Sequence, residues 1–264
     1  MSKIEPNLIK ITSKQGYDKT SWLKEGDRHR ESSALLRNTR RQNYDLFKIA
    51  KSDKEKRRCI EIMDACVYSS TLLIAYAYEL TLKAGITCLY LGCSQKLFEK
   101  DIKSKYGHNL VKAADDLKLS LSEDQRTDLR SLENVLMKTG RYPIISSDTN
   151  QYLQNINARS YDFWDDNKYN ERLDLLEDIR GHVKLIDADS GNPVTYITYK
   201  IDEDGYFCFR MGGRLSARIT VKYSEYQARN GLNSRQAMRD LLLSNDALKP
   251  LFAYYWDKAE YIED

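Results

Sequence analysis

The run of residues 65–82 constrains the fold more than any other part of the chain. It is almost entirely apolar or small, yet it also contains Tyr, Ser, Thr and one Glu. A helix that is apolar on all sides lies either in the centre of a helical domain or in a membrane. The polar residues in this run favour burial in a soluble core. We therefore expect a central helix from about Asp53 to Ala84, with Gly85 as its C-cap.

Several other stretches of the first half have helical spacing. Apolar residues predict an amphipathic helix over 31–51, a short helix at 95–100 and a third helix that begins after Gly107. Ser122 followed by Gln125 forms a capping box, which predicts the start of a further helix. That helix ends at Gly140, because Pro143 blocks its continuation. Helices joined by short connections predict an up-and-down bundle.

The pattern changes after residue 143. An acidic helix is expected over 166–190, and three runs at 194–200, 206–210 and 215–221 alternate with period two. Turns separate these runs, so they predict a small antiparallel sheet. Two helices, 234–243 and 247–261, follow it. The predicted fold is mainly α, a helical bundle with a C-terminal α+β extension.

This pattern divides the 264 residues into three parts. Residues 1–27 are predicted to form an N-terminal arm, 28–145 the bundle, and 146–264 the α+β region. The whole chain has a net charge of +3, but residues 1–60 contain 16 Lys and Arg against 8 Asp and Glu. Two interpretations of this basic part stay open: a surface that attracts nucleic acid, or an ordinary solvated helix face.

The number and spacing of the cysteines argue against a disulfide-bonded or zinc-binding protein. The five cysteines are an odd number without Cys-x-x-Cys spacing, which favours a reducing compartment, and none clusters with His at the distances of a zinc site. We expect a cytoplasmic protein without metal, cofactor or membrane span. The sequence 210–214, Arg-Met-Gly-Gly-Arg, is either a phosphate-gripping turn or, as is more common, a plain hairpin turn.

A few polar residues of the bundle are candidates for a site. Glu79 and Lys83 are four residues apart and therefore share a helix face. In an up-and-down bundle, Lys83 at the end of one helix, His108 at the start of the next and Arg141 past the last would lie at the same end. These residues either form a polar site or stabilise the bundle as ion pairs and caps.

Four motifs in order give the bundle a resemblance to a known family. They are residues 79–85 (Glu-Leu-Thr-Leu-Lys-Ala-Gly), 106–110 (Tyr-Gly-His-Asn-Leu), 117–124 leading into a Leu-rich helix, and 140–143 (Gly-Arg-Tyr-Pro). This order resembles the HEPN-like proteins of prokaryotes and covers under half of the chain. The resemblance implies a helical bundle that is often dimeric and is linked to RNA or nucleotides, in stress, toxin–antitoxin or phage-defence systems.

The resemblance also assigns candidate roles. His108 and Arg141 would be catalytic, whereas Glu79, Lys83, Asn109 and Tyr142 would contact a ligand or phosphate. Many HEPN nucleases carry Arg-x4-6-His, and this chain departs from that pattern. No Arg stands five to seven residues before His29, His108 or His182.

Three functions follow from these observations. The first is an RNA- or nucleotide-associated protein with a polar site at one end of the bundle, which we expect to be a homodimer. The second is a protein–protein interaction module without nucleic-acid activity, in which the C-terminal region binds a partner. The third is a metal-independent ribonuclease in which His108 removes the proton of the 2′-hydroxyl and Arg141 stabilises the phosphorane.

Overall fold

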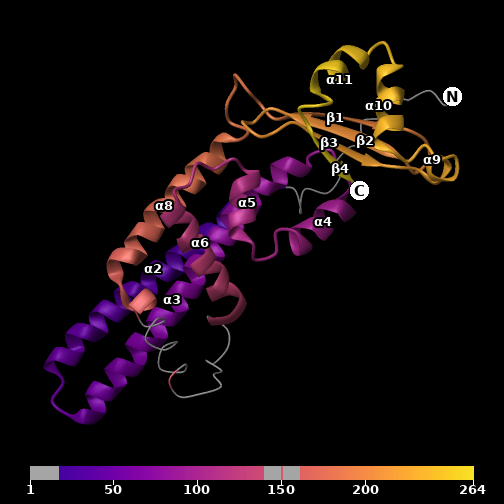
Figure 1. Ribbon diagram of the computed structural model, residues 1–264. Coiled ribbons are helices and arrows are strands. Elements are labelled where there is room, and N and C mark those ends of the chain that lie inside the picture. Colours follow the sequence, from indigo (N-terminus) through magenta and orange to yellow (C-terminus); the bar gives the residue numbers. More distant parts are fainter. Residues whose placement is uncertain (1–17, 140–149, 151–160) are drawn as a thin grey trace.

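The computed structural model describes residues 18–139, 150 and 161–264, and its two longest helices form a hairpin. Helix α2 spans Lys19–Ile49 and helix α3 spans Asp53–Thr87, and they pack along each other (Figure 1). Ser52 and Glu55 form a capping box at the start of α3. The central helix predicted from the sequence is therefore present, and it is the longest element of the fold.

Helix α2 begins twelve residues before the start that we predicted. Leu23 and Gly26 are buried in its first turns, and a Cβ at Gly26 would lie 3.1 Å from Thr81 Oγ1 of α3. The described residues of the proposed N-terminal arm, 18–27, thus belong to the bundle. The sequence missed them because this part of α2 is mostly polar, and its stability comes from packing against α3 rather than from propensity.

Gly85 was predicted as a C-cap, but α3 continues through it to Thr87. A Cβ at position 85 would lie 2.7 Å from Leu117 Cδ1 and 3.1 Å from Val183 Cγ2. Glycine is therefore required here by close packing between neighbouring helices and not by the end of a helix.

Within residues 95–139 and 166–185, four shorter helices and one π-helical segment pack with the hairpin. They are α4 (Gln95–Ser104), α5 (Leu110–Asp116), α6 (Glu123–Asn134), the π-helix Val135–Thr139 and α8 (Asp166–Leu185). The predicted capping box of Ser122 and Gln125 is confirmed at the start of α6. Helix α8 packs along α3, so this helix is part of the bundle although the sequence placed it in the C-terminal region (Figure 1).

The C-terminal part contains a four-stranded sheet in the order β1-β2-β3-β4. Strands β1 (Thr195–Lys200), β2 (Tyr206–Met211) and β3 (Arg218–Lys222) are antiparallel, as predicted. Strand β4 (Glu260–Glu263) is parallel to β3, so the sheet is mixed. The helix predicted over 247–261 is wrong at its end, because residues 260–263 pair with β3. A four-residue strand with a distant partner leaves little periodicity in the sequence.

Three short helices accompany the sheet: α9 (Glu225–Arg229), α10 (Arg235–Leu243) and α11 (Lys249–Tyr255). Alternate residues of β2 enter different cores. Tyr206 and Cys208 pack with the bundle, whereas Phe207 and Phe209 pack with α10 and α11. The sheet therefore lies between the end of the bundle and the last helices (Figure 1). A mainly helical bundle with a C-terminal α+β extension is confirmed.

Burial also explains the most apolar segment. The helical stretch Asp53–Tyr90 is long and apolar enough to cross a membrane, but 72% of its most apolar window is buried inside the protein. This is the pattern of the core helix of a soluble protein. All five cysteines are free and buried, so they are core residues of the fold.

Candidate functional site

Three of the predicted site residues meet on one side of α3. The Glu79 carboxylate accepts a hydrogen bond from Lys83 Nζ at 2.5 Å, one helical turn further along. Its other oxygen lies 2.9 Å from His108 Nδ1, in the connection between α4 and α5. Glu79 is buried, and the Lys83 side chain is nearly so. A buried charge needs a partner. Glu79 and Lys83 therefore neutralise each other near the end of the apolar part of α3.

The contact with Glu79 fixes how His108 can act. An ionised carboxylate only accepts hydrogen bonds, so Nδ1 carries the proton and the neutral ring keeps its lone pair on Nε2. The His108 side chain is 32% exposed. A histidine held by a carboxylate on one nitrogen can remove a proton with the other. The same geometry also suits a purely structural link between α3 and α5.

The remaining predicted site residues have different positions. Asn109 is the N-cap of α5, and its side-chain oxygen accepts a hydrogen bond from the Lys112 amide at 3.0 Å. It thus has a structural role in the fold. Glu133 of α6 also supports this helix start, because it accepts from the Val111 amide at 2.9 Å. Arg141 and Tyr142 lie outside the described residues.

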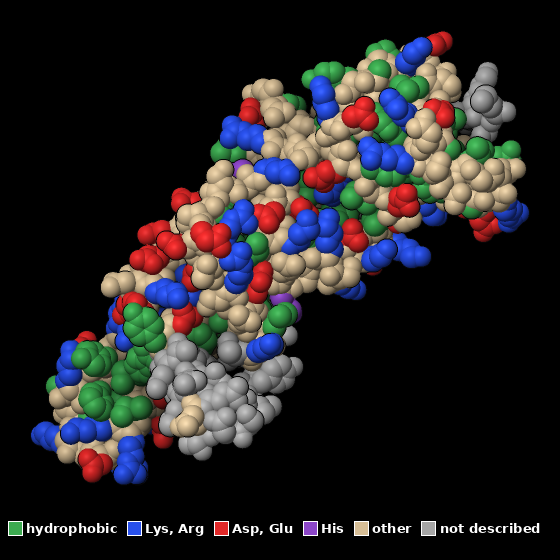
Figure 2. Space-filling model, in the orientation of Figure 1, with side chains coloured by type: hydrophobic (Ala, Val, Ile, Leu, Met, Phe, Trp, Pro, Cys, Tyr) green, Lys and Arg blue, Asp and Glu red, His purple; other side chains and the backbone are tan. Residues whose placement is uncertain are grey.

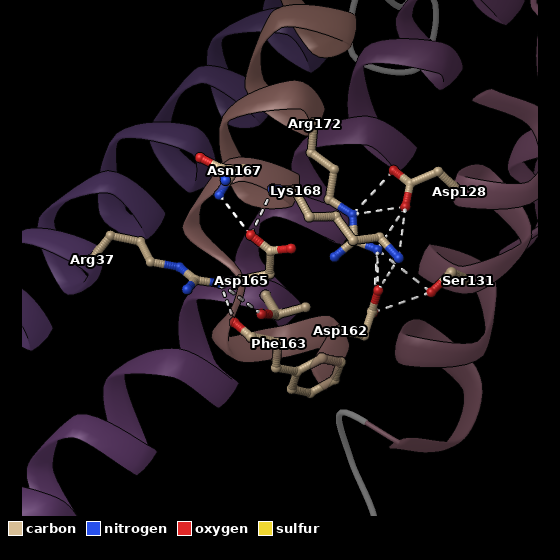
Figure 3. A network of polar contacts seen from close by, with 10 residues as sticks. Arg37, Asp128, Ser131, Asp162, Phe163, Asp165, Asn167, Lys168 and Arg172 are labelled. Atoms are coloured by element: carbon tan, nitrogen blue, oxygen red, sulfur yellow. Dashed lines mark hydrogen bonds and ion pairs between the residues drawn. The ribbon is translucent and has the colours of Figure 1, made fainter. Parts of the chain in front are cut away.

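A buried ionic network of the bundle surrounds Arg172 of α8, which is 2% exposed (Figure 3). Its guanidinium donates to both oxygens of Asp128, at 2.6 Å in the shortest contact, and to Asp162 at 3.0 Å. Lys168 pairs with Asp162 as well. Burial alone would raise the pKa of Asp162, but the charges of Arg172 and Lys168 outweigh it and hold this pKa below its usual value.

Arg37 of α2 occupies a second buried position close to the start of α8 (Figure 3). It donates to the Phe163 carbonyl at 2.8 Å and lies 3.5 Å from Asp166. Burial lowers its pKa to about 10, and Asp166 opposes that shift. Arg40 also pairs with Asp166, at 2.6 Å. These two arginines of the basic N-terminal part are therefore used inside the fold.

The glycine turn at 212–213 uses the Gly213 amide and its neighbouring arginines within the fold. The Gly213 amide donates to the Asn192 carbonyl at 2.9 Å. The buried Arg210 guanidinium donates to the carbonyls of Gly212, at 3.2 Å, and Ser216. Arg214 pairs with Asp189. Both arginines thus hold the turn against the chain around it, which agrees with a plain hairpin turn.

The closed end of the α2–α3 hairpin differs from this turn, because it exposes cations that form no ion pair with any described residue. We call residues 44–60 the hairpin tip; it projects beyond the start of α8 (Figure 1). Residues 51–57 of the tip include four exposed cations that form no ion pair with any described residue, and two exposed carboxylates lie among them. The cations are Lys51, Lys54, Lys56 and Arg57, and the carboxylates are Asp53 and Glu55. Figure 2 shows hydrophobic side chains among the basic ones on this end of the molecule.

The sequence shows that the N-terminal part is basic, but not which of its cations are used inside the fold and which are exposed. Arg37 and Arg40 were grouped there with Lys56, Arg57 and Arg58. The structure separates them, because the first two reach α8 and the last three lie at the tip. The sequence contains one signal for this separation. Residues 51–57 surround the turn between two long helices, so their cations are expected to lie away from the other helices.

Comparison with protein-family models, with curated proteins and with solved structures returned no match. The resemblance to HEPN-like proteins therefore stays a prediction based on the four motifs.

Proposed function

We propose that the protein binds RNA and that the hairpin tip is its main contact surface. The observation that carries this proposal is the group of four cations at 51, 54, 56 and 57, which have no ion pair among the described residues. Cations so close together repel one another, and a phosphate backbone removes that repulsion while it releases counterions. Tyr44 is half exposed on the same tip, with Lys48 Nζ 4.3 Å from its ring centre, and could stack on a base.

The test is RNA binding at several salt concentrations. The tip variant replaces Lys51, Lys54, Lys56 and Arg57 with Ala. The control variant replaces four exposed lysines on separate elements, Lys184, Lys200, Lys222 and Lys249, with Ala. Both variants lose four positive charges, so only the location differs. Fluorescence anisotropy with transfer RNA and with a single-stranded oligonucleotide reports the affinity.

Wild type is expected to bind more weakly as salt rises, with a slope that reflects about four phosphate contacts. The tip variant should lose most of the affinity and most of the slope, and the control variant should keep both. Equal loss in the two variants would mean that net charge alone attracts RNA. No binding by wild type at low salt would refute the proposal and favour the interaction module.

A second candidate function, cleavage of RNA, is favoured by the hydrogen bond that His108 Nδ1 donates to Glu79. In this reaction His108 Nε2 takes the proton from a 2′-hydroxyl, and that oxygen attacks the adjacent phosphorus. The bond to the 5′-oxygen breaks, water supplies its proton, and a 2′,3′-cyclic phosphate remains. Glu79 would orient the ring and stabilise the imidazolium as it forms.

This candidate is tested with transfer RNA in EDTA. Wild type should release products with a cyclic phosphate, and His108→Ala should abolish the activity. Glu79→Gln should retain part of it with an altered pH profile, because an amide stabilises the imidazolium less than a carboxylate does. Glu79 lies about 37 Å along α3 from Lys54 at 1.5 Å per residue, so the tip variant should weaken binding without changing the cleavage rate at saturating RNA. Identical products from wild type and His108→Ala would exclude the mechanism.

A further inference from the structure

The hairpin tip exposes hydrophobic side chains as well as cations. Tyr44, Leu46, Ile49 and Ile60 are between 43% and 72% exposed, and Leu35 is exposed on the same hairpin. Soluble proteins seldom gather aliphatic side chains on one exposed end unless a partner covers them. Phosphates would neutralise the cations of the tip but would leave Leu46 and Ile49 in water. A protein surface with negative charge would cover both kinds of side chain.

Such a surface is present on the same chain. A groove of about 530 Å³ lies between α6 and α8, and its lining includes Leu175, Asp124 of α6 and three acidic residues of α8. Among the described residues, its one lining cation, Lys168, pairs with Asp162. The acidic residues of α8 are Glu171, Asp174 and Asp178, which recur at helical spacing and therefore share one face. We call this surface the acidic groove.

The carboxylates of the acidic groove divide into two kinds. Asp128 lies in the wall but is bound by Arg172. The other four, Asp124, Glu171, Asp174 and Asp178, form no ion pair with any residue that the structure describes. Three of them follow one another on the face of α8, where like charges repel. The acidic groove thus has four unpaired carboxylates, and the hairpin tip has four unpaired cations of opposite charge.

We propose that the hairpin tip of one copy of the protein docks in the acidic groove of a second copy. The two surfaces are different, so the contact is heterologous, and each copy keeps one free tip and one free groove. The copies therefore assemble head to tail, unlike the closed homodimer expected from the family resemblance. Docking places Lys54 and Arg57 near the α8 carboxylates and covers the exposed aliphatic side chains of the tip.

This contact uses the same cations as the proposed RNA site, so RNA and a second copy compete for the tip. The docking itself does not require RNA and is tested without it. If RNA binding fails and self-association holds, only the proposed function is lost. If self-association fails, the RNA experiment is unaffected.

The experiment is sedimentation velocity of the full chain over a range of concentrations at low and high salt. The tip variant is the one defined above. The groove variant carries Asp124→Asn, Glu171→Gln, Asp174→Asn and Asp178→Asn. Wild type should associate at low salt and dissociate at high salt, because exposed ion pairs are screened. Each variant alone should associate at least about tenfold more weakly, since four exposed pairs are lost.

An equimolar mixture of the two variants gives the decisive result. The intact tip of the groove variant fits the intact groove of the tip variant. The remaining tip and the remaining groove both carry the substitutions, so no second contact can form. The mixture should therefore form a 1:1 complex that does not grow further. A mixture that stays monomeric, a wild type that stays monomeric at low salt, or a variant that still associates as wild type does would each overturn the proposal. The groove variant should also keep the circular dichroism spectrum and the cooperative unfolding of wild type, which shows that it is folded.

Discussion

The Arg172 network and the hairpin tip use the same residue types in opposite ways. Arg172 is 2% exposed and has Asp128 on one side and Asp162 on the other, while Lys168 completes the group. At the tip, four cations are exposed and have no described partner. Charges that hold helices together are paired within the chain, whereas charges without a partner are available to another molecule. The basic surface that is available for binding is therefore smaller than the basic part of the sequence.

The largest expected effect tests the paired side of this comparison. Arg172→Ala should destabilise the protein by about 3–5 kcal/mol, because it removes the guanidinium that Asp128 and Asp162 share and leaves these partly buried carboxylates with Lys168 alone. Arg130→Ala is the matched control. Arg130 pairs with Glu123 on the surface at 2.9 Å, where solvent screens both charges, so its loss should cost far less. Urea denaturation followed by circular dichroism measures both, and similar losses would contradict the contrast.

The pH dependence of the same network gives a sharper test. The pKa of Asp162 is lowered in the folded protein, so its stabilising effect is complete above the unfolded pKa, about 3.9. The effect is lost as pH falls through the lower, folded value. Asp162→Asn should therefore cost stability at pH 7, on the order of 3 kcal/mol, and this difference from wild type should shrink below about pH 4. Urea denaturation at a series of pH values measures the difference, and a gap that stays constant into acid would show that Asp162 acts by packing alone.

The sequence predicted much of the fold because the strongest patterns are local. The apolar run 65–82, the capping box at Ser122 and the alternation of three strands each reflect one element and its neighbours. The errors involve contacts between distant parts of the chain. The start of α2 depends on burial against α3, Gly85 depends on Leu117 and Val183, and β4 depends on β3.

The candidate site was predictable to a similar extent. Helical spacing joined Glu79 to Lys83, and the order of helices brought His108 to the same side of α3, where it meets Glu79. The sequence could not tell that Asn109 caps α5, since capping and ligand contact use the same amide oxygen. It also missed the Arg172 network, whose partners are 44 and 10 positions away in the chain.

Two glycines provide a smaller contrast between a buried and an exposed position. A Cβ at Gly85 meets Leu117 at 2.7 Å, whereas a Cβ at Gly181 of α8 has no neighbour within 4 Å. Alanine favours a helix over glycine by about 1 kcal/mol. Gly181→Ala should therefore stabilise the protein by about that amount. Gly85→Ala should instead destabilise it by about 1–3 kcal/mol through overpacking. Thermal denaturation of both variants checks the prediction. Stabilisation by Gly85→Ala would mean that Leu117 and Val183 can move away from α3.

The smallest expected effect concerns the tip itself. Unlike Arg172, the four tip cations stabilise nothing in the described fold, so replacing them with Ala should change the free energy of unfolding by less than about 0.5 kcal/mol. The sign should favour the variant at low salt, because repulsion among the cations is removed, and the gain should vanish at high salt, where wild type is screened as well. Urea denaturation at two salt concentrations, at protein concentrations low enough to prevent self-association, measures this. A loss above about 1 kcal/mol would mean that these cations have a structural partner within the chain, and their role in binding would then have to be separated from their role in folding.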